Sequence, residues 1–206
     1  MKKLFLAVLA AGLAMGIGAA RTSANPPQSS QSTAQEKDTT TPSYDMKAQS
    51  IEDLQDLQKK FTALAGAIPA EKYSWRPGEG VRSIGEVYLH IAAANHNIPT
   101  MIGAAKSPQF MTKGFEQSVT DKQQIITVLN ESFDYAISVV KGMSNADFAK
   151  AQKQLGPDAN SGDVVYLLVT HAHEHLGQSI AYARMNGVVP PWTAAAQAKA
   201  KAADKD

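Results

Sequence analysis

Two histidines spaced four residues apart are the part of this sequence best suited to chemistry. His171 and His175 would lie one turn apart on one helix face, close enough to share a cation at about 2.0–2.1 Å. Val164 and Leu168 fall on the same face, so both imidazoles should project into a buried interface. Burying two imidazoles without a partner is costly, and a metal ion would offset that cost. The chain has no cysteine, so any transition metal must be held by His, Asp or Glu.

A third ligand is expected from another helix. His90 stands beside Ala94 and Met101 at the edge of an apolar stripe, from which its side chain can turn into the protein. Three neutral imidazoles would leave coordination positions for water or substrate, as catalytic zinc sites do. The alternative is that these histidines are core residues of a purely structural protein, because a lone histidine on an apolar face is usually a core residue.

The remaining polar residues near these positions are predicted to play lesser parts. His96 and His173 project away from the apolar stripes of their helices and are predicted to face solvent. Glu174 lies on the flank, either as a solvated charge or as a partner that orients a histidine. Gln178, one turn beyond His175, could bond that ligand or pack across the helix pair, and both interpretations remain open.

Helical spacing of apolar residues runs through most of the chain, and no segment alternates as a strand would. The pattern predicts an all-α domain over residues 46–192, built as a four-helix bundle. Three long connections, at 70–82, 104–119 and 143–160, are expected to cover one mouth of the bundle. The four main helices are expected at 46–67, from Ser83 to about 103, from Thr120 to Gly142, and from near Ser161 to about Met185.

Capping signals support these starting points. Ser83 and Glu86 have the spacing of a capping box, and Thr120 and Gln123 have its glutamine form. A short extra helix is expected after Ser144. The starts of the second and third helices therefore have a local physical reason, separate from the apolar pattern.

The two ends of the chain have compositions unlike the domain between them. Met1, Lys2 and Lys3 precede an apolar stretch from Leu4 to about Gly18, which is typical of a signal peptide covering residues 1–24, with cleavage after Ala20 or Ala24. Residues 25–45 are rich in Pro, Gln, Ser and Thr and are predicted to be a disordered linker, and the Ala/Lys-rich tail 193–206 is predicted to be frayed or disordered. A periplasmic or secreted protein without a stable membrane anchor is therefore expected.

Charge argues against nucleic acid as a partner. Cleavage after residue 24 removes Lys2, Lys3 and Arg21 from the 20 basic residues, which leaves 17 against 19 acidic ones. No basic run or basic-aromatic stripe accompanies this balance. The expected partner is a small-molecule ligand or substrate.

Several motifs, in order, resemble the DinB-like superfamily across about residues 47–192. They are Ile68-Pro-Ala-Glu-Lys-Tyr-Ser-Trp-Arg-Pro77, Ser83-Ile-Gly-Glu86, His90-Ile91, His171-x-x-x-His175-x-Gly-Gln178 and Gly187-Val-Val-Pro-Pro191. The resemblance implies an up-down-down-up four-helix bundle that binds a divalent metal, zinc or nickel most often, through His90, His171 and His175. Leu176 departs from the pattern, because the family often has Arg at that position.

Two classes of function follow from these observations. One is a metal-dependent transferase or hydrolase acting on a small molecule. The other is a non-catalytic metal or small-ligand binding module of the cell envelope. Better-known cytosolic members of the superfamily use low-molecular-weight thiols, which are scarce outside the cytoplasm, so an exported chain is not expected to share that activity. Bundles of this type often pair through helix faces, so a homodimer is compatible with either class.

Overall fold

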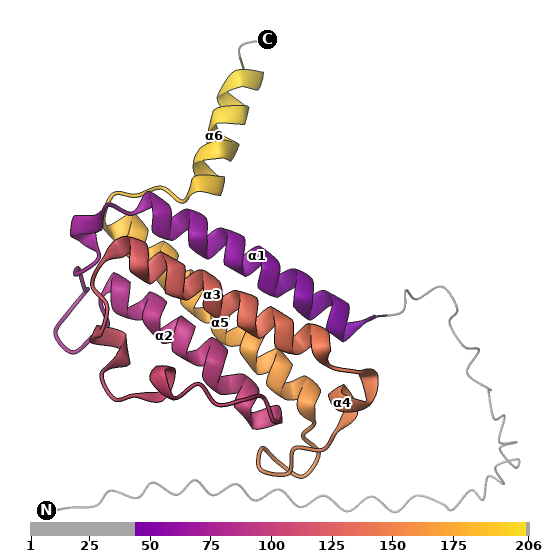
Figure 1. The fold of residues 1–206 in the computed structure, drawn as a ribbon. Helices are drawn as coiled ribbons and strands as arrows, with labels where there is room; N and C mark the ends of the chain where they lie inside the picture. Colours follow the sequence, from indigo (N-terminus) through magenta and orange to yellow (C-terminus); the bar gives the residue numbers. More distant parts are fainter. Residues whose placement is uncertain (1–43, 205–206) are drawn as a thin grey trace, which may run out of the picture. The chain divides into compact units, whose positions relative to one another are not determined.

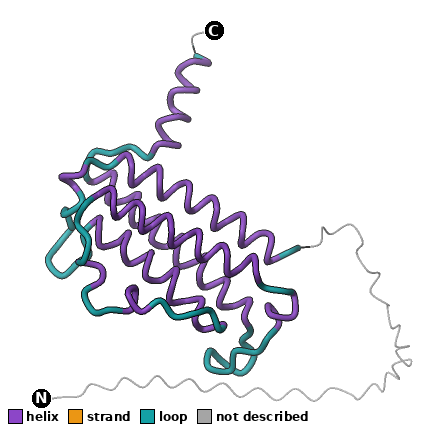
Figure 2. The backbone as a smooth tube through the Cα atoms, viewed as in Figure 1, coloured by secondary structure: helices purple, strands orange, loops and turns teal. Residues whose placement is uncertain are grey.

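A computed structural model describes residues 44–204, and within them the chain is helical with no β-strand (Figures 1 and 2). The proposed signal peptide and nearly all of the proposed linker lie outside the described residues. None of the described helices has the length and apolar character needed to cross a membrane. The α-helices are α1 (Met46–Ala67), α2 (Ile84–Asn97), α3 (Lys122–Gly142), α4 (Asn145–Ala149), α5 (Ser161–Met185) and α6 (Pro191–Ala203).

Helices α1 and α3 run antiparallel. Lys122, at the start of α3, donates from Nζ to the carbonyl oxygens of Gly66 and Ile68, at 2.8 and 2.7 Å, where α1 ends. At the opposite end, Lys47 of α1 donates to the carbonyl oxygen of Met143, directly after α3. Both lysines therefore stabilise C-terminal carbonyls that lack a partner within their own helix.

Helices α2 and α3 run parallel, although they are consecutive in the chain. Gly85, in the first turn of α2, lies so close to Ile125 of α3 that an added Cβ would sit 3.1 Å from its Cδ1. Gly162, in the first turn of α5, lies equally close to Met46 of α1, because a Cβ added to Gly162 would sit 3.3 Å from Sδ of Met46. The bundle is therefore up-down-down-up, as predicted.

This topology requires a long return between α2 and α3. Residues 103–121, here called the crossover, lead from the C-terminal end of α2 back to the start of α3 and include the short 3₁₀ helices Pro108–Met111 and Phe115–Gln117. Both short helices contact α2 (Figure 1). The crossover therefore covers the side of α2 that faces away from the bundle core.

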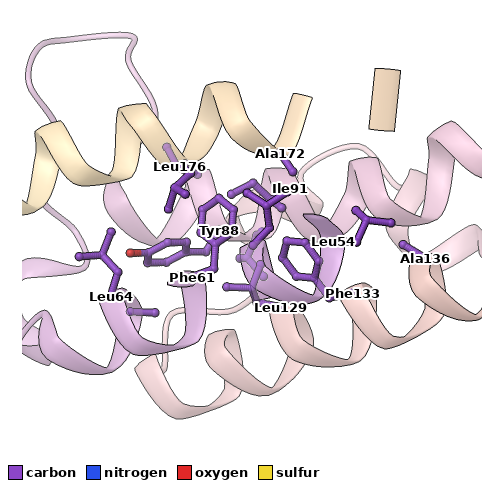
Figure 3. Close-up of a cluster of buried hydrophobic side chains, with 14 of the residues drawn as sticks. Leu54, Phe61, Leu64, Tyr88, Ile91, Leu129, Phe133, Ala136, Ala172 and Leu176 are labelled. Atoms are coloured by element: carbon purple, nitrogen blue, oxygen red, sulfur yellow. The ribbon is translucent and has the colours of Figure 1, made fainter. Parts of the chain in front are cut away.

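Aromatic and aliphatic side chains from all four long helices fill the core (Figure 3). Phe61 of α1 lies at its centre, with its ring centroid 5.6 Å from that of Phe133 and 6.3 Å from that of Tyr88. Leu176, the residue that departs from the expected motif, is 6% exposed and packs in this cluster. These contacts hold α2 and α5, the two helices with the histidines, in one rigid arrangement.

The helix starts confirm most of the capping predictions. Ser83 and Glu86 form the expected capping box at α2, and a short helix, α4, follows Ser144. The prediction for α3 was wrong by one residue, because Asp121 is the N-cap and its carboxylate accepts from the backbone N–H of Gln124 at 2.9 Å. A carboxylate is stabilising at this position because it lies at the positive end of the helix dipole.

Replacing Ser83 with alanine tests the α2 cap. The substitution leaves the Glu86 backbone N–H without its acceptor and should lower the free energy of unfolding by about 1 kcal/mol. Urea unfolding followed by circular dichroism measures the change, with Ser138→Ala on the exposed side of α3 as the control. A loss as small as that of the control would contradict the role of the box.

The C-terminal segment differs from its prediction. The Ala/Lys-rich tail was expected to be frayed or disordered, yet α6 is helical to Ala203. Pro191 occupies the first helical turn, where its fixed φ favours a helix start, and alanine has the highest helix propensity. Local propensity therefore forms this helix without an apolar face.

Candidate metal centre

The structure brings together the three histidines that the sequence singled out. One ring nitrogen each from His90, His171 and His175 lies within 4.8 Å of the others. His171 and His175 occupy successive turns of α5, and His90 faces them from α2, with its ring centroid 5.2 and 4.8 Å from theirs. All three side chains are partly buried at the interface of the two helices.

This arrangement fits a metal ion by two measures. The Nε2 atoms of His90 and His171 are 3.3 Å apart, and two nitrogens bound to one tetrahedral zinc lie about 3.3–3.4 Å apart. The other ring nitrogen of His171, Nδ1, is buried and has no hydrogen-bond partner among the described residues. Three imidazoles suit zinc, nickel or copper better than calcium or magnesium. The donor set therefore accommodates the expected divalent metal.

Two side chains fix the orientation of the histidine rings. His90 Nδ1–H donates to Glu116 Oε1 at 2.7 Å, and His175 Nδ1–H donates to Gln178 Oε1 at 2.7 Å. Gln178 in turn donates to the hydroxyl of Tyr182 at 3.0 Å. Because the acceptor oxygens require a proton on Nδ1, the Nε2 lone pairs of both rings remain available for a cation. Gln178 thus bonds a candidate ligand, which was one of its two predicted roles.

Glu116 is the residue of this centre that sequence reasoning missed. It lies on the crossover, and its carboxylate also accepts from Arg82, with Nε–Oε2 at 2.5 Å and Nη2–Oε1 at 3.0 Å. Burial alone would raise the pKa of Glu116, but hydrogen bonds from Arg82 and His90 outweigh it and hold the pKa below its usual value. Glu116 is therefore a fixed negative charge beside the histidines.

The environment keeps the imidazoles of His90 and His171 neutral. Burial, followed by the neighbouring His175 and His90, lowers the pKa of His171 to about 4. Burial also lowers the pKa of His90, and this effect exceeds the opposing hydrogen bond to Glu116. Neutral imidazole is the form that binds metal ions, so protonation of His90 and His171 does not compete with metal at neutral pH.

These pKa values predict how the metal-free protein responds to acid. The folded state binds the His171 proton more weakly than the unfolded state does. The contribution of neutral His171 to the free energy of unfolding is therefore complete above pH 6.5 and is lost as pH falls toward about 4. Between pH 7 and 5.5 we expect a loss of at most about 1 kcal/mol from this residue. Urea unfolding at both pH values checks this, and the loss should shrink in His171→Gln. An equal loss in wild type and variant would contradict the assignment.

His96 is buried, although it was predicted to face solvent. It is 8% exposed, stacked between the rings of Phe110 and Tyr135 at centroid distances of 3.8 and 4.3 Å, with Nδ1 3.1 Å from Ser107 Oγ. The helical pattern placed it correctly on the side of α2 away from the core, but the crossover covers that side. His96 therefore anchors the crossover.

The two other uncertain residues lie in solvent. His173 is exposed on α5, as predicted. Glu174 is exposed too and does not bond the three histidines, so its role as a solvated charge is confirmed over that of an orienting partner.

Glu116 lines cavities that adjoin the candidate centre. One, of about 410 Å³, lies between α2 and the crossover and reaches His90. The other, of about 510 Å³, is lined by Arg76, Arg82 and Gln178, so it reaches the residue that orients His175. Cavities of small-molecule size therefore adjoin His90 and the two side chains, Glu116 and Gln178, that orient the histidine rings.

Comparison with known proteins gives the chain its family. Residues 53–179 match the DinB superfamily, and no curated protein matches the chain. A DinB-like protein from Bacillus cereus shares 16% identity over 69% of this chain and 93% of its own, with a TM-score of 0.57. YjoA, a DinB-like protein from Bacillus subtilis, shares 16% identity over 68% of this chain and 92% of its own, with a TM-score of 0.53.

A third solved structure shares the bundle. YfiT from Bacillus subtilis, described as a probable metal-dependent hydrolase with an unusual four-helix bundle topology, shares 14% identity over 72% of this chain and 91% of its own, with a TM-score of 0.55. At these identities the likeness of all three structures concerns the fold. The family match spans more than half of the sequence, and the chain belongs to the DinB superfamily.

Proposed function

We propose that this protein is a metal-dependent hydrolase of a small molecule, with a divalent ion, zinc or nickel, held by His90, His171 and His175. The observation that carries the proposal is the convergence of three imidazole nitrogens beside two cavities. A divalent ion on three imidazoles acidifies water and polarises a carbonyl oxygen. The name given to YfiT supports the same class of reaction.

The protein's own residues would prepare the site in three ways. Glu116 and Gln178 accept from Nδ1 of two of the rings and so leave their Nε2 lone pairs free for a cation. Partial burial keeps the imidazoles of His90 and His171 neutral. Arg82 balances the charge of Glu116, so the pair adds no net charge beside a substrate. The site is thus pre-organised before any ligand arrives.

Export favours hydrolysis over thiol transfer. Water is available in every compartment, whereas low-molecular-weight thiols are scarce outside the cytoplasm. The support for export is the basic start of the chain followed by the apolar stretch from Leu4 to Gly18. Fractionation of producing cells, with sequencing of the mature N-terminus, tests it, and a full-length cytoplasmic product would contradict it.

Turnover measurements test the proposed activity. Protein starting at residue 25 and purified without chelator should hydrolyse members of an ester and amide panel, lose the activity on chelation and regain it with zinc or nickel. His173→Ala serves as the control, because His173 is exposed on the same helix. A fully metal-loaded protein that turns over no member of the panel would count against a hydrolase.

One observation favours a binding module as the second candidate. Both oxygens of Glu116 already accept hydrogen bonds from Arg82 and His90. This carboxylate therefore orients His90, a candidate metal ligand, instead of serving as a general base. A non-catalytic protein would show a rise in melting temperature with metal or ligand, without turnover.

A further inference from the structure

Two arginines from the loop between α1 and α2 line a cavity outside the three-histidine centre. We name it the arginine cavity, and its charged lining residues are Arg76, Arg82, Glu86 and Glu116. Its volume of about 510 Å³ lies within the roughly 300–1,000 Å³ of small-molecule pockets. Both arginine side chains are 43% exposed, so a ligand from solvent can contact them. The histidines of the candidate centre are not among the lining residues.

The two carboxylates of the arginine cavity are already engaged. Glu86 accepts from the backbone N–H of Ser83 at 2.6 Å and from Gln117 Nε2 at 3.1 Å, and it pairs with Arg76 Nη2 at 3.1 Å. Glu116 likewise accepts three hydrogen bonds, from the two side chains described above. A carboxylate has about four acceptor positions. The cavity therefore has little capacity left for a cationic group.

The two guanidinium groups, in contrast, have donors to spare. Each guanidinium carries five N–H groups. Arg76 uses Nη1 on the carbonyl oxygen of Val81 at 2.8 Å and Nη2 on Glu86, so its Nε–H has no acceptor within residues 44–204. Arg82 uses Nε and Nη2 on Glu116, which leaves its Nη1 without an acceptor in the same range. The cavity therefore offers more donors than acceptors to a ligand.

The balance of charge narrows the kind of acceptor. A carboxylate is planar and matches two parallel N–H groups of a guanidinium, and hydrogen bonds between ions are about twice as strong as those between neutral groups. The two arginines and two glutamates of the lining cancel in charge. A dianion such as phosphate would place its second charge beside two carboxylates without a free cation to balance it. A singly charged carboxylate suits this cavity best.

We infer that the arginine cavity is a binding site for the carboxylate group of a small molecule, held by Arg76 and Arg82. The site is separate from the histidines and needs no metal ion. The inference therefore goes beyond the proposed function and is testable without metal.

Three compounds of similar size test the inference in metal-free protein. Titrations of benzoate, benzamide and phenyl phosphate at pH 7.5 are followed by NMR of the nitrogen-15-labelled chain. Without metal, no carboxylate can bind an ion at the histidines. Benzoate should shift the backbone signals of Gly80 and Val81, which line the cavity, and should bind at least about tenfold more tightly than neutral benzamide. Phenyl phosphate, with a charge of about −2, should bind more weakly than benzoate.

Paired substitutions separate hydrogen bonding from net charge. Arg76→Gln should weaken benzoate binding about tenfold, but it also frees the charge of Glu86. The double variant Arg76→Gln/Glu86→Gln restores the balance of charge, and glutamine can still complete the capping box. Because the guanidinium is missing, the weaker binding should persist in the double variant. Arg184→Gln, at an exposed position of α5, is the matched control and should bind benzoate as wild type does.

The second ion pair permits the same experiment. Arg82→Gln/Glu116→Gln removes the other guanidinium and keeps the charge balanced, and it should also weaken benzoate binding. Circular dichroism checks that each variant is folded before titration.

The outcomes separate this inference from the proposed function. Equal affinities for benzoate and benzamide, or shifts confined to residues away from the cavity, would overturn the site. Wild-type affinity in both double variants would assign the effect to net charge and overturn the role of the arginines. Tighter binding of phenyl phosphate would overturn the carboxylate class in favour of phosphate. Benzoate binding by a protein that takes up no metal would contradict the proposed function and leave this inference standing.

Discussion

Replacing His171 with alanine should abolish stoichiometric metal binding. Nε2 of His171 lies 3.3 Å from Nε2 of His90, and without His171 the remaining two imidazoles belong to different helices. Loss of a ligand should cost more than the roughly 10–100-fold in affinity that loss of a ligand's hydrogen-bond partner costs. Elemental analysis should find one zinc or nickel per wild-type chain and almost none in the variant.

Melting temperature provides a second measurement of the same loss. Metal at 100 times its dissociation constant stabilises a folded protein by about 2.7 kcal/mol, so wild type should melt at a higher temperature with metal than without it. His171→Ala should show no such rise, and His173→Ala should match wild type because His173 is exposed on the same helix. Equal metal content in the two variants would refute the three-histidine site.

Replacing Glu116 with glutamine should weaken metal binding about 10–100-fold without abolishing it. Glutamine keeps the size of the side chain but loses the charge, so His90 Nδ1 has a weaker acceptor and Arg82 loses its ion pair. Competition with a chelator of known affinity measures the dissociation constant. Because all three histidines remain, the variant should still bind one ion at saturation.

A matched change controls for charge. Glu131→Gln makes the same substitution at an exposed position of α3 and should leave the dissociation constant unchanged. If Glu116→Gln also leaves it unchanged, Glu116 does not hold His90 in its binding orientation. Folding can be checked in each variant by circular dichroism before metal is added.

The sequence predicts those parts of the site that depend on one helix at a time. His171 and His175 lie on the apolar stripe of α5, so a period of 3.6 residues is enough to place both in the interior. His90 is found by the same reasoning at the edge of the α2 stripe. The bundle itself follows from four such stripes, because each must be covered by the others.

The sequence does not predict what depends on how the crossover lies against α2. Glu116 and His90 are 26 residues apart, and no periodicity relates a loop residue to a helix face. The exposure assigned to His96 was wrong for the same reason, because the covering rings of Phe110 and Tyr135 come from other segments. The usable signal is indirect: parallel consecutive helices force the crossover back along α2, which brings some of its side chains to the level of His90.

The division between helices and crossover has a consequence for how members of this superfamily could diversify. The three histidines lie on rigid helices whose inner faces are constrained by close packing, where a change of even one methylene is felt. The crossover faces solvent on its other side, and surface connections tolerate insertion, deletion and substitution far better than helix interiors do. Mutation of the crossover can therefore reshape the cavity between it and α2 while the histidines stay in place. Such a chain can change what it recognises without first losing the centre that would act on it.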